Sequence, residues 1–218
     1  MSDKAHRGVW AAAVAAALVE LAAAAVYLGV MAASAPDVDR LAAVPIAALF
    51  AAPAVLALAG LRGRAPLLLA AAIAAAVLAV FPFSLHSFVL GPVAVVYAIA
   101  YARRSTSRQR RRAMFAVVGC PVLLMAAFVV LTLQEHPACF EELETGEVVI
   151  DRDPGDTLSG SHLIGPDSDV VTTGCTSDIT VWWEATASLA LTSAAIVTGL
   201  LLVPNDNREH WHSRASAT

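Results

Sequence analysis

The sequence predicts an all-α polytopic membrane protein with six transmembrane helices and a small β-rich exterior segment between the fifth and the sixth. Hydrophobic residues make up 58% of the 218 residues and charged residues only 15%, whereas soluble domains carry about 25% charged residues. The apolar residues fall in long unbroken runs, which an amphipathic soluble helix does not show. Acidic and basic residues are also segregated along the chain, so the net charge of −4 is not informative as a sum.

The length of each of the first apolar runs indicates how many membrane crossings it contains. One crossing of about 30 Å of hydrocarbon needs roughly 20 apolar residues. Residues 8–32 and 41–61 each supply one crossing. Residues 65–101 contain no Asp, Glu, Lys or Arg over 37 positions, about twice the length of one crossing. We therefore expect two helices here, at 65–82 and 84–101, joined by a turn near Pro82.

The last two crossings are residues 113–133 and 181–203, and Pro204 stops the second of them. The chain is then organised as a block of five helices over 1–133, with a cytoplasmic Arg-rich loop at 102–112. An acidic segment outside the cytoplasm follows at 134–180, then the sixth helix and a tail at 204–218. We expect this tail to be a disordered terminus.

The positions of the basic residues orient these helices. Six crossings place both termini on one side of the membrane, and twelve of the 14 Lys and Arg residues fall on that side. Only Arg40 and Arg152 fall opposite. Because Lys and Arg favour the cytoplasmic side, both termini are predicted to be cytoplasmic. The 13 Arg against a single Lys, with frequent Ala, suggest a GC-rich bacterial genome, and hence a bacterial plasma (inner) membrane.

The acidic segment carries two of the three cysteines, Cys139 and Cys175. In an oxidising exterior such a pair favours a disulfide, which would stabilise the segment by roughly 3–4 kcal/mol in the chain-entropy model. The runs GEVVIDR and SDVVTTG are β-branched and bounded by Gly, Pro and Asp, as strands are. We predict a small disulfide-stapled β-hairpin or β-meander.

The same segment does not match a metal site. Asp151, Asp153 and Asp156 lie close together in the sequence, but the Gly and Glu positions of a calcium-binding EF-hand loop are not met. His136 and His162 lack the additional ligands that zinc requires. Thiol redox catalysis usually uses Cys-x-x-Cys, which the chain lacks. We expect no metal ion and no cofactor.

Glu20 lies near the middle of the first apolar run, in AALVELAAAA. A carboxylate at the bilayer centre costs several kcal/mol, so such residues are functional hypotheses. The predicted partners are Thr192 and Ser193 in the last helix, or carbonyl groups freed by prolines in the fourth and fifth helices. Two interpretations stay open: a proton- or cation-coupling site, or a hydrogen bond that fixes helix packing.

The sixth helix has one face of small and polar residues. Glu184 lies one turn inside its outer boundary beside Trp182, where we expect it to reach water. Small residues let helices approach closely in lipid, so this face predicts a helix interface or the lining of a pathway. Its members follow a spacing of three or four: Glu184, Ser188, Thr192, Ala195 and Gly199.

The cytoplasmic loop RRSTSRQRRR is a cluster of arginines beside two helix ends. Near a membrane surface each basic residue attracts anionic head groups by about 1 kcal/mol. The cluster is therefore predicted either to contact anionic lipid or to serve as a topology determinant alone. Its arginines are Arg103, Arg104, Arg108, Arg110, Arg111 and Arg112.

No catalytic motif occurs in the sequence, and no segment is large enough for a soluble catalytic domain. We therefore expect no catalytic residues and no nucleic-acid partner; the sequence does not indicate an oligomeric state. The leading hypothesis is an interaction, sensing or accessory component that acts through a protein partner at the exterior segment. The alternative is a small proton- or cation-coupled transporter that uses Glu20. A membrane enzyme is a third possibility, which would require His86, Glu184 and His162 to converge.

Overall fold

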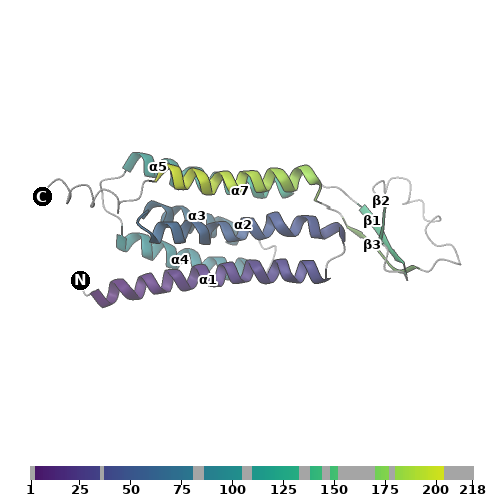
Figure 1. Ribbon diagram of the computed structural model, residues 1–218, viewed down its shortest axis with the longest axis horizontal. Helices are drawn as coiled ribbons and strands as arrows, with labels where there is room; N and C mark the ends of the chain where they lie inside the picture. Colours follow the sequence, from purple (N-terminus) through teal and green to yellow (C-terminus); the bar gives the residue numbers. More distant parts are fainter. Residues whose placement is uncertain are drawn as a thin grey trace, which may run out of the picture.

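The computed structural model describes residues 3–34, 37–80, 86–104, 110–132, 138–143, 148–151, 170–176 and 180–203. Six helices in these ranges pack lengthwise into a bundle, and three strands form a sheet beyond one end of it (Figure 1). The helices are α1 (Asp3–Ser34), α2 (Asp37–Leu61), α3 (Pro66–Val80), α4 (His86–Arg104), α5 (Arg110–Thr132) and α7 (Trp182–Leu202).

The helical membrane class predicted from hydropathy is confirmed. Each helix lies within a few residues of its predicted range, because the apolar runs set both its position and its length. Among the described residues, helices long and apolar enough to cross a membrane cover Arg7–Ala33, Ala42–Leu61, Met114–Thr132 and Trp182–Leu202.

The long run at 65–101 forms two separate helices, as predicted, and the first of them is short. At 1.5 Å per residue, the 15 residues of α3 span only about 22 Å. In Figure 1 the hairpin of α3 and α4 covers the half of the bundle away from the sheet. The turn expected near Pro82 lies outside the described residues.

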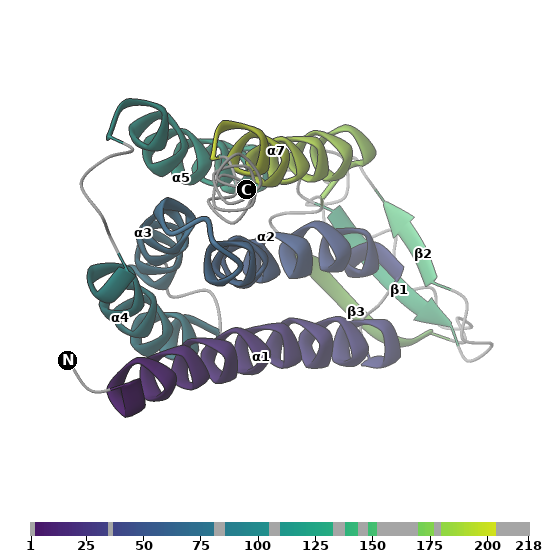
Figure 2. The same ribbon diagram turned by 60° about the vertical axis from the view of Figure 1, so that its left-hand side comes forward.

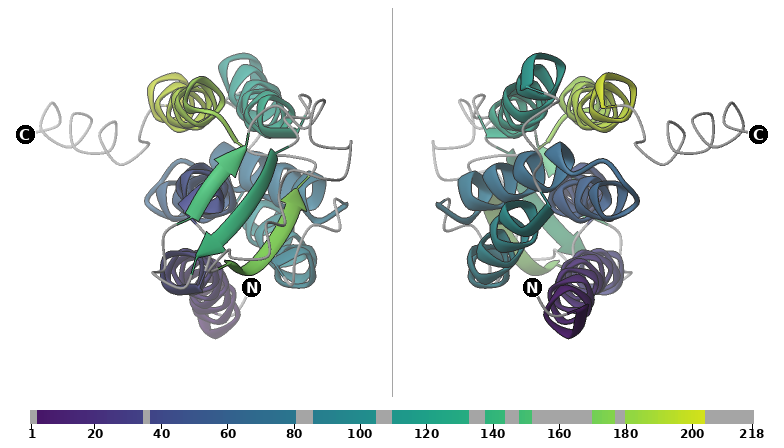
Figure 3. Two further views of the ribbon diagram at one scale, coloured as in Figure 1. Left: turned by 90° about the vertical axis from the view of Figure 1, so that its right-hand side faces the viewer. Right: turned by 90° about the vertical axis from the view of Figure 1, so that its left-hand side faces the viewer.

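The bundle has three layers, which Figure 3 shows end-on. One outer layer is α5 with α7, the other is α1 with α4, and α2 with α3 lies between them. Buried side chains are mostly Ala and Leu, while large apolar side chains such as Val26, Phe115 and Leu201 are exposed. A surface of this kind is what lipid covers in a membrane protein.

The turn between α2 and α3 is tight and is held from α4. Gly63 has a φ of 102°, a conformation that favours glycine. A Cβ atom at Gly60 would lie 2.9 Å from the backbone nitrogen of Leu68, so only glycine fits there without a shift. Arg104 closes the turn: its Nη1 donates a hydrogen bond to the Leu61 carbonyl at 2.7 Å, at the C-terminal end of α2.

The sheet consists of β1 (Ala138–Leu143), β2 (Val148–Asp151) and β3 (Val170–Thr176) in the order β2-β1-β3. Both pairings are antiparallel, and an irregularity falls between Glu142 and Leu143 where β1 meets β3. The register sets Cys139 directly opposite Cys175. Only the backbone of these strands is described, so the predicted disulfide stays a prediction. The acidic residues at 152–169 and His162 lie outside the described residues.

Candidate functional site

Glu20 lies on the one face of α1 that the bundle buries. The buried residues of this helix recur every three or four positions, as one helical face requires: Ala13, Ala17, Glu20 and Ala24. Only 2% of the surface of Glu20 is exposed. The residue lies at the middle of the apolar span Arg7–Ala33, so the carboxyl group is held inside protein at the centre of a membrane-length helix.

The partner of Glu20 is Tyr97 of α4. The Tyr97 hydroxyl donates a hydrogen bond to Glu20 Oε2 at 2.8 Å, and Tyr97 is itself fully buried. The backbone of Ala54 in α2, which follows Pro53, lies near the same carboxyl group. The other oxygen, Oε1, has no hydrogen-bond partner among the described residues. The site therefore has one satisfied oxygen and one that is open to a further donor.

The predicted partners of Glu20 on the last helix, Thr192 and Ser193, were wrong. Ser193 is exposed on α7, and Thr192, although buried, belongs to the far layer of the bundle. The middle layer of α2 and α3 separates α7 from α1, as Figure 3 shows. Hydropathy indicates the depth of a residue but not which helices are neighbours, so Tyr97 was missed. A hydroxyl-bearing side chain far from either end of an apolar helix was the signal available for it.

The second group of buried polar side chains lies on α7. Its described buried residues are Glu184, Ala185, Ser188, Thr192, Ala195 and Gly199, which include every member of the face found from the spacing. Ser188 and Thr192 are 0% and 3% exposed, and neither hydroxyl has a hydrogen-bond partner among the described residues. The face is turned toward neighbouring helices, and two of its polar groups are unsatisfied there.

Glu184 does not reach water as expected, because it caps its own helix. It is 1% exposed, and its Oε2 accepts a hydrogen bond from the Val181 backbone N–H at 3.0 Å. The first N–H groups of a helix lack intrahelical partners, and a Glu at the third helical position satisfies one of them by reaching back. This local bond holds the carboxylate at the sheet end of α7.

Cys120 joins α5 to α7 in the interior. It is buried, with a free thiol whose Sγ donates a hydrogen bond to the Ala195 carbonyl at 3.2 Å. A Cβ atom at Gly199 would lie 3.1 Å from Cys120 Sγ, Leu56 Cδ2 and Leu67 Cδ2 alike. Gly199 therefore lies at a close approach of α7 to three neighbouring helices.

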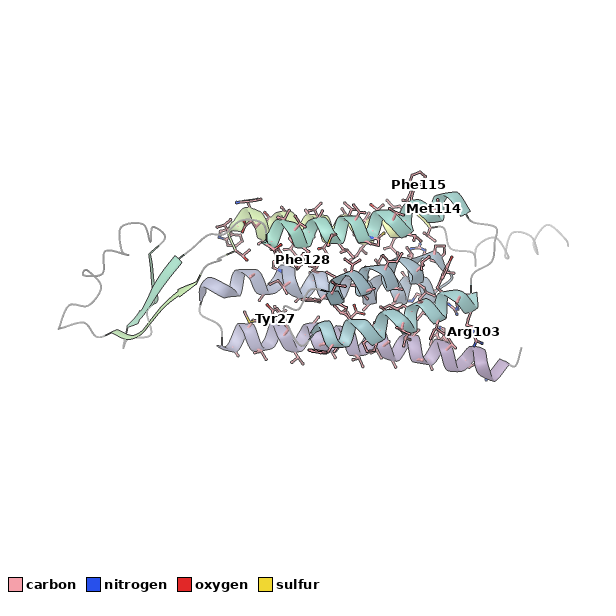
Figure 4. The ribbon with its side chains drawn as sticks, turned by 180° about the vertical axis from the view of Figure 1, so that it is seen from behind. Tyr27, Arg103, Met114, Phe115 and Phe128 are labelled. Atoms are coloured by element: carbon pink, nitrogen blue, oxygen red, sulfur yellow. The ribbon has the colours of Figure 1, made fainter. Side chains whose placement is uncertain are left out.

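The arginine cluster is only partly described. Arg104 is half-buried and hydrogen-bonded to Leu61, whereas Arg103 is exposed at the same end of α4 (Figure 4). Arg108 and the side chains of 110–112 lie outside the described part of the chain. Contact with anionic lipid stays a prediction for the cluster, and Arg104 has a structural role besides.

The described residues contain no group of three or more His, Cys, Asp or Glu that could hold a metal ion. His162 and the side chain of His86 lie outside the described part, so their predicted convergence with Glu184 is not tested. No protein-family model, curated protein or solved structure matches this chain.

Proposed function

We propose that the chain is a bacterial plasma-membrane protein with six crossings and both termini in the cytoplasm. It acts as an interaction, sensing or accessory component through its exterior segment, residues 134–180. The distribution of basic residues supports this orientation. So does the bundle, in which α1 begins and α7 ends at the end opposite the sheet (Figure 1).

The observation that carries the proposal is the connection of the sheet to the bundle. The paired strands β1 and β3 follow α5 and precede α7 in the chain. These two helices lie side by side along the bundle (Figure 2), and Cys120 and Ala195 hydrogen-bond between them. A partner that binds the sheet therefore acts on one helix pair that runs from the sheet to the arginine cluster at the start of α5.

A disulfide between Cys139 and Cys175 is part of this proposal. The two residues are directly opposite on antiparallel strands, where Cα atoms lie about 4.5–5.5 Å apart. A disulfide accepts Cα separations of about 4.4–6.8 Å, so the register is compatible with the bond. It would fix the pairing of the two strands that lead into the membrane.

Counting thiols in intact spheroplasts tests the bond and the orientation together. Free thiols are first blocked, and the cells are then treated with an impermeant reductant and a heavy, membrane-impermeant maleimide. Heavy label on Cys139 and Cys175 only after reduction is the expected result, with Cys120 unlabelled. Label on neither cysteine in spheroplasts, but on both in inverted vesicles, would place the sheet in the cytoplasm and overturn the proposal.

The role of the exterior segment is tested by complementation of a strain that lacks the gene. A chain without residues 140–174 is expected to insert, as judged by carbonate-resistant membrane association, but to reproduce the phenotype of the null strain. A matched chain with a flexible linker of equal length in place of the segment controls for the shortened connection. Full complementation by either chain would show that the exterior segment is dispensable.

Proton or cation coupling through Glu20 is the second candidate, and it is favoured by Oε1, which has no hydrogen-bond partner among the described residues. A carboxyl group at mid-membrane that hydrogen-bonds through one oxygen to Tyr97 leaves the other for a proton or a cation. A role in helix packing alone would need only the hydrogen bond between Glu20 and Tyr97. Proton or cation exchange needs, in addition, a lone pair that a second group can reach, and Oε1 offers one without displacing a partner among the described residues.

Flux measurements in proteoliposomes test this candidate. A pH-sensitive dye and a Na⁺-sensitive dye report ion movement driven by an imposed gradient. Wild-type protein is expected to carry flux that Glu20→Gln abolishes and Glu20→Asp retains in part, with the melting temperature of each variant measured alongside. Equal flux in wild type and Glu20→Gln, or none above empty liposomes in either, counts against the coupling role.

A further inference from the structure

On the buried face of α7, the hydroxyl groups of Ser188 and Thr192 have no hydrogen-bond partner among the described residues. In membrane helices Ser and Thr commonly bond to the carbonyl one turn earlier, as exposed Thr186 does to the Trp182 carbonyl at 2.9 Å. Ser188 and Thr192 are buried, yet neither makes such a bond or any other among the described residues. Buried polar groups in proteins are nearly always paired with protein or with ordered water. These two hydroxyls therefore require a partner.

Helix α2 lies against this face, and its register with α7 can be fixed. Both helices run from the sheet end of the bundle toward the other end (Figure 1). Leu56 Cδ2 approaches the Cβ position of Gly199 to 3.1 Å, so these two residues are level. Seven residues earlier on each helix is two turns. This brings Thr192 level with Leu49, which is 1% exposed.

The carbonyl of Leu49 has lost its regular helical donor. Residue 53 is a proline, which has no N–H to offer the carbonyl four positions before it. Leu49 is two turns from Leu56, so the two share a face of α2. A buried backbone acceptor without its usual partner thus lies at the level of the Thr192 hydroxyl.

The buried face of α7 carries polar groups at the sheet end and is tightly packed against apolar side chains at the other end. At the sheet end it begins with the Glu184 carboxylate, one turn before Ser188. At the far end Gly199 is in close contact with Cys120 and with leucines of α2 and α3. Polar groups therefore extend from the sheet end to Thr192, and beyond that point the helices are too tightly packed for any ligand.

We propose that Ser188, Thr192 and the Leu49 carbonyl hold a short file of water molecules between α7 and α2, which enters from the sheet end and stops before Gly199. Side chains one turn apart on a helix are about 5–6 Å apart, a gap that one water with two hydrogen bonds of about 2.8 Å bridges. The layer of α2 separates this file from Glu20. The inference thus depends on neither proposed function.

Cysteine alkylation tests whether water reaches these positions. Maleimides react with thiolates, and a thiolate forms only where water is present. Single variants Ser188→Cys and Thr192→Cys are treated with N-ethylmaleimide in native membranes, and labels are located by peptide mass spectrometry. Ser193→Cys is the matched control, because Ser193 is exposed on the outer, lipid-facing side of the same helix. Native Cys120, beside Gly199, is the internal control.

Labelling of both buried positions at least tenfold faster than Ser193→Cys and Cys120 is the expected result. Rates at positions 188 and 192 equal to that of Cys120 would show a dry interface and overturn the proposal. Equal rates at 188, 192 and 193 would mean that the whole helix meets water, which overturns it as well. The melting temperatures of all variants in detergent show whether each variant is folded.

The sign of a stability change gives a second, independent test. Thr192→Val keeps the shape of the side chain and removes the hydroxyl. In a dry interface the unpaired hydroxyl is a penalty, so its removal would raise the melting temperature and contradict the proposal. A hydrated hydroxyl contributes hydrogen bonds, and we expect the melting temperature to fall by a few degrees. Thr186→Val, at an exposed position, is the control for the substitution itself.

Discussion

At the scale of single residues, burial of polar groups defines what is particular to this protein. The sequence correctly indicated that Glu20 lies near the middle of an apolar helix of membrane length and that the spaced residues of α7 form one face. It could not supply Tyr97 as the partner, because a partner in another helix depends on which helices are neighbours. Nor could it show that Glu184 is withdrawn from water and accepts a hydrogen bond from the Val181 N–H just before α7.

Tyr97→Phe should destabilise the protein by about 1–3 kcal/mol, the cost of leaving a buried polar group without its partner. The change removes the only hydrogen bond to a side chain that the described residues give Glu20. Adding Glu20→Leu should restore much of the lost stability, because both polar groups are then gone. Unfolding free energies by denaturant titration in bicelles measure the effect. A double variant as unstable as the sum of both single variants would contradict this account.

At the scale of helices and strands, length and composition predicted most boundaries within a few residues. The division of residues 65–101 into two helices followed from the absence of any charge over twice a membrane thickness. The connections between helices were less predictable. Arg104 belongs to a cluster that the sequence assigned to lipid or topology, yet its guanidinium reaches from α4 to the C-terminal end of α2.

Arg104→Ala should lower the unfolding free energy by about 1–2 kcal/mol, since it removes a charged donor from the last carbonyls of α2. Arg103→Ala is the matched control: it removes the same charge from the neighbouring, exposed position. Both changes weaken any attraction to anionic lipid alike. A difference between the two variants in lipid-free detergent therefore isolates the hydrogen bond, and equal stabilities would exclude its contribution.

At the scale of the whole molecule, apolar runs and basic residues predicted the membrane class and one orientation. They did not predict three layers with α2 and α3 in the middle (Figure 3). Helices in lipid associate by close packing of small side chains, and Ala is frequent in every helix of this chain. Many pairings were therefore compatible with the sequence, and only the detailed fit at positions such as Gly60 and Gly199 selects among them.

The short α3 has a consequence for the lipid around the protein. In the half of the bundle nearer the sheet, Figure 4 shows Tyr27 of α1 and Phe128 of α5 on the inner sides of their helices. The 15 residues of α3 cover about 22 Å, against about 30 Å for a typical hydrocarbon core. Bilayers deform to match short apolar segments, at a fraction of a kcal/mol per ångström.

We expect the melting temperature to be higher in bilayers of 14-carbon than of 20-carbon phosphatidylcholine, measured in nanodiscs of equal size. A melting temperature that rises with lipid chain length would show that the length of α3 is not matched to a thin membrane. If the expectation holds, the bilayer would be thinner beside α3 than around the rest of the protein, and short-chain or disordered lipids would gather there. The bilayer would then differ in thickness from one side of the protein to the other, and the protein would collect in thinner regions of the membrane.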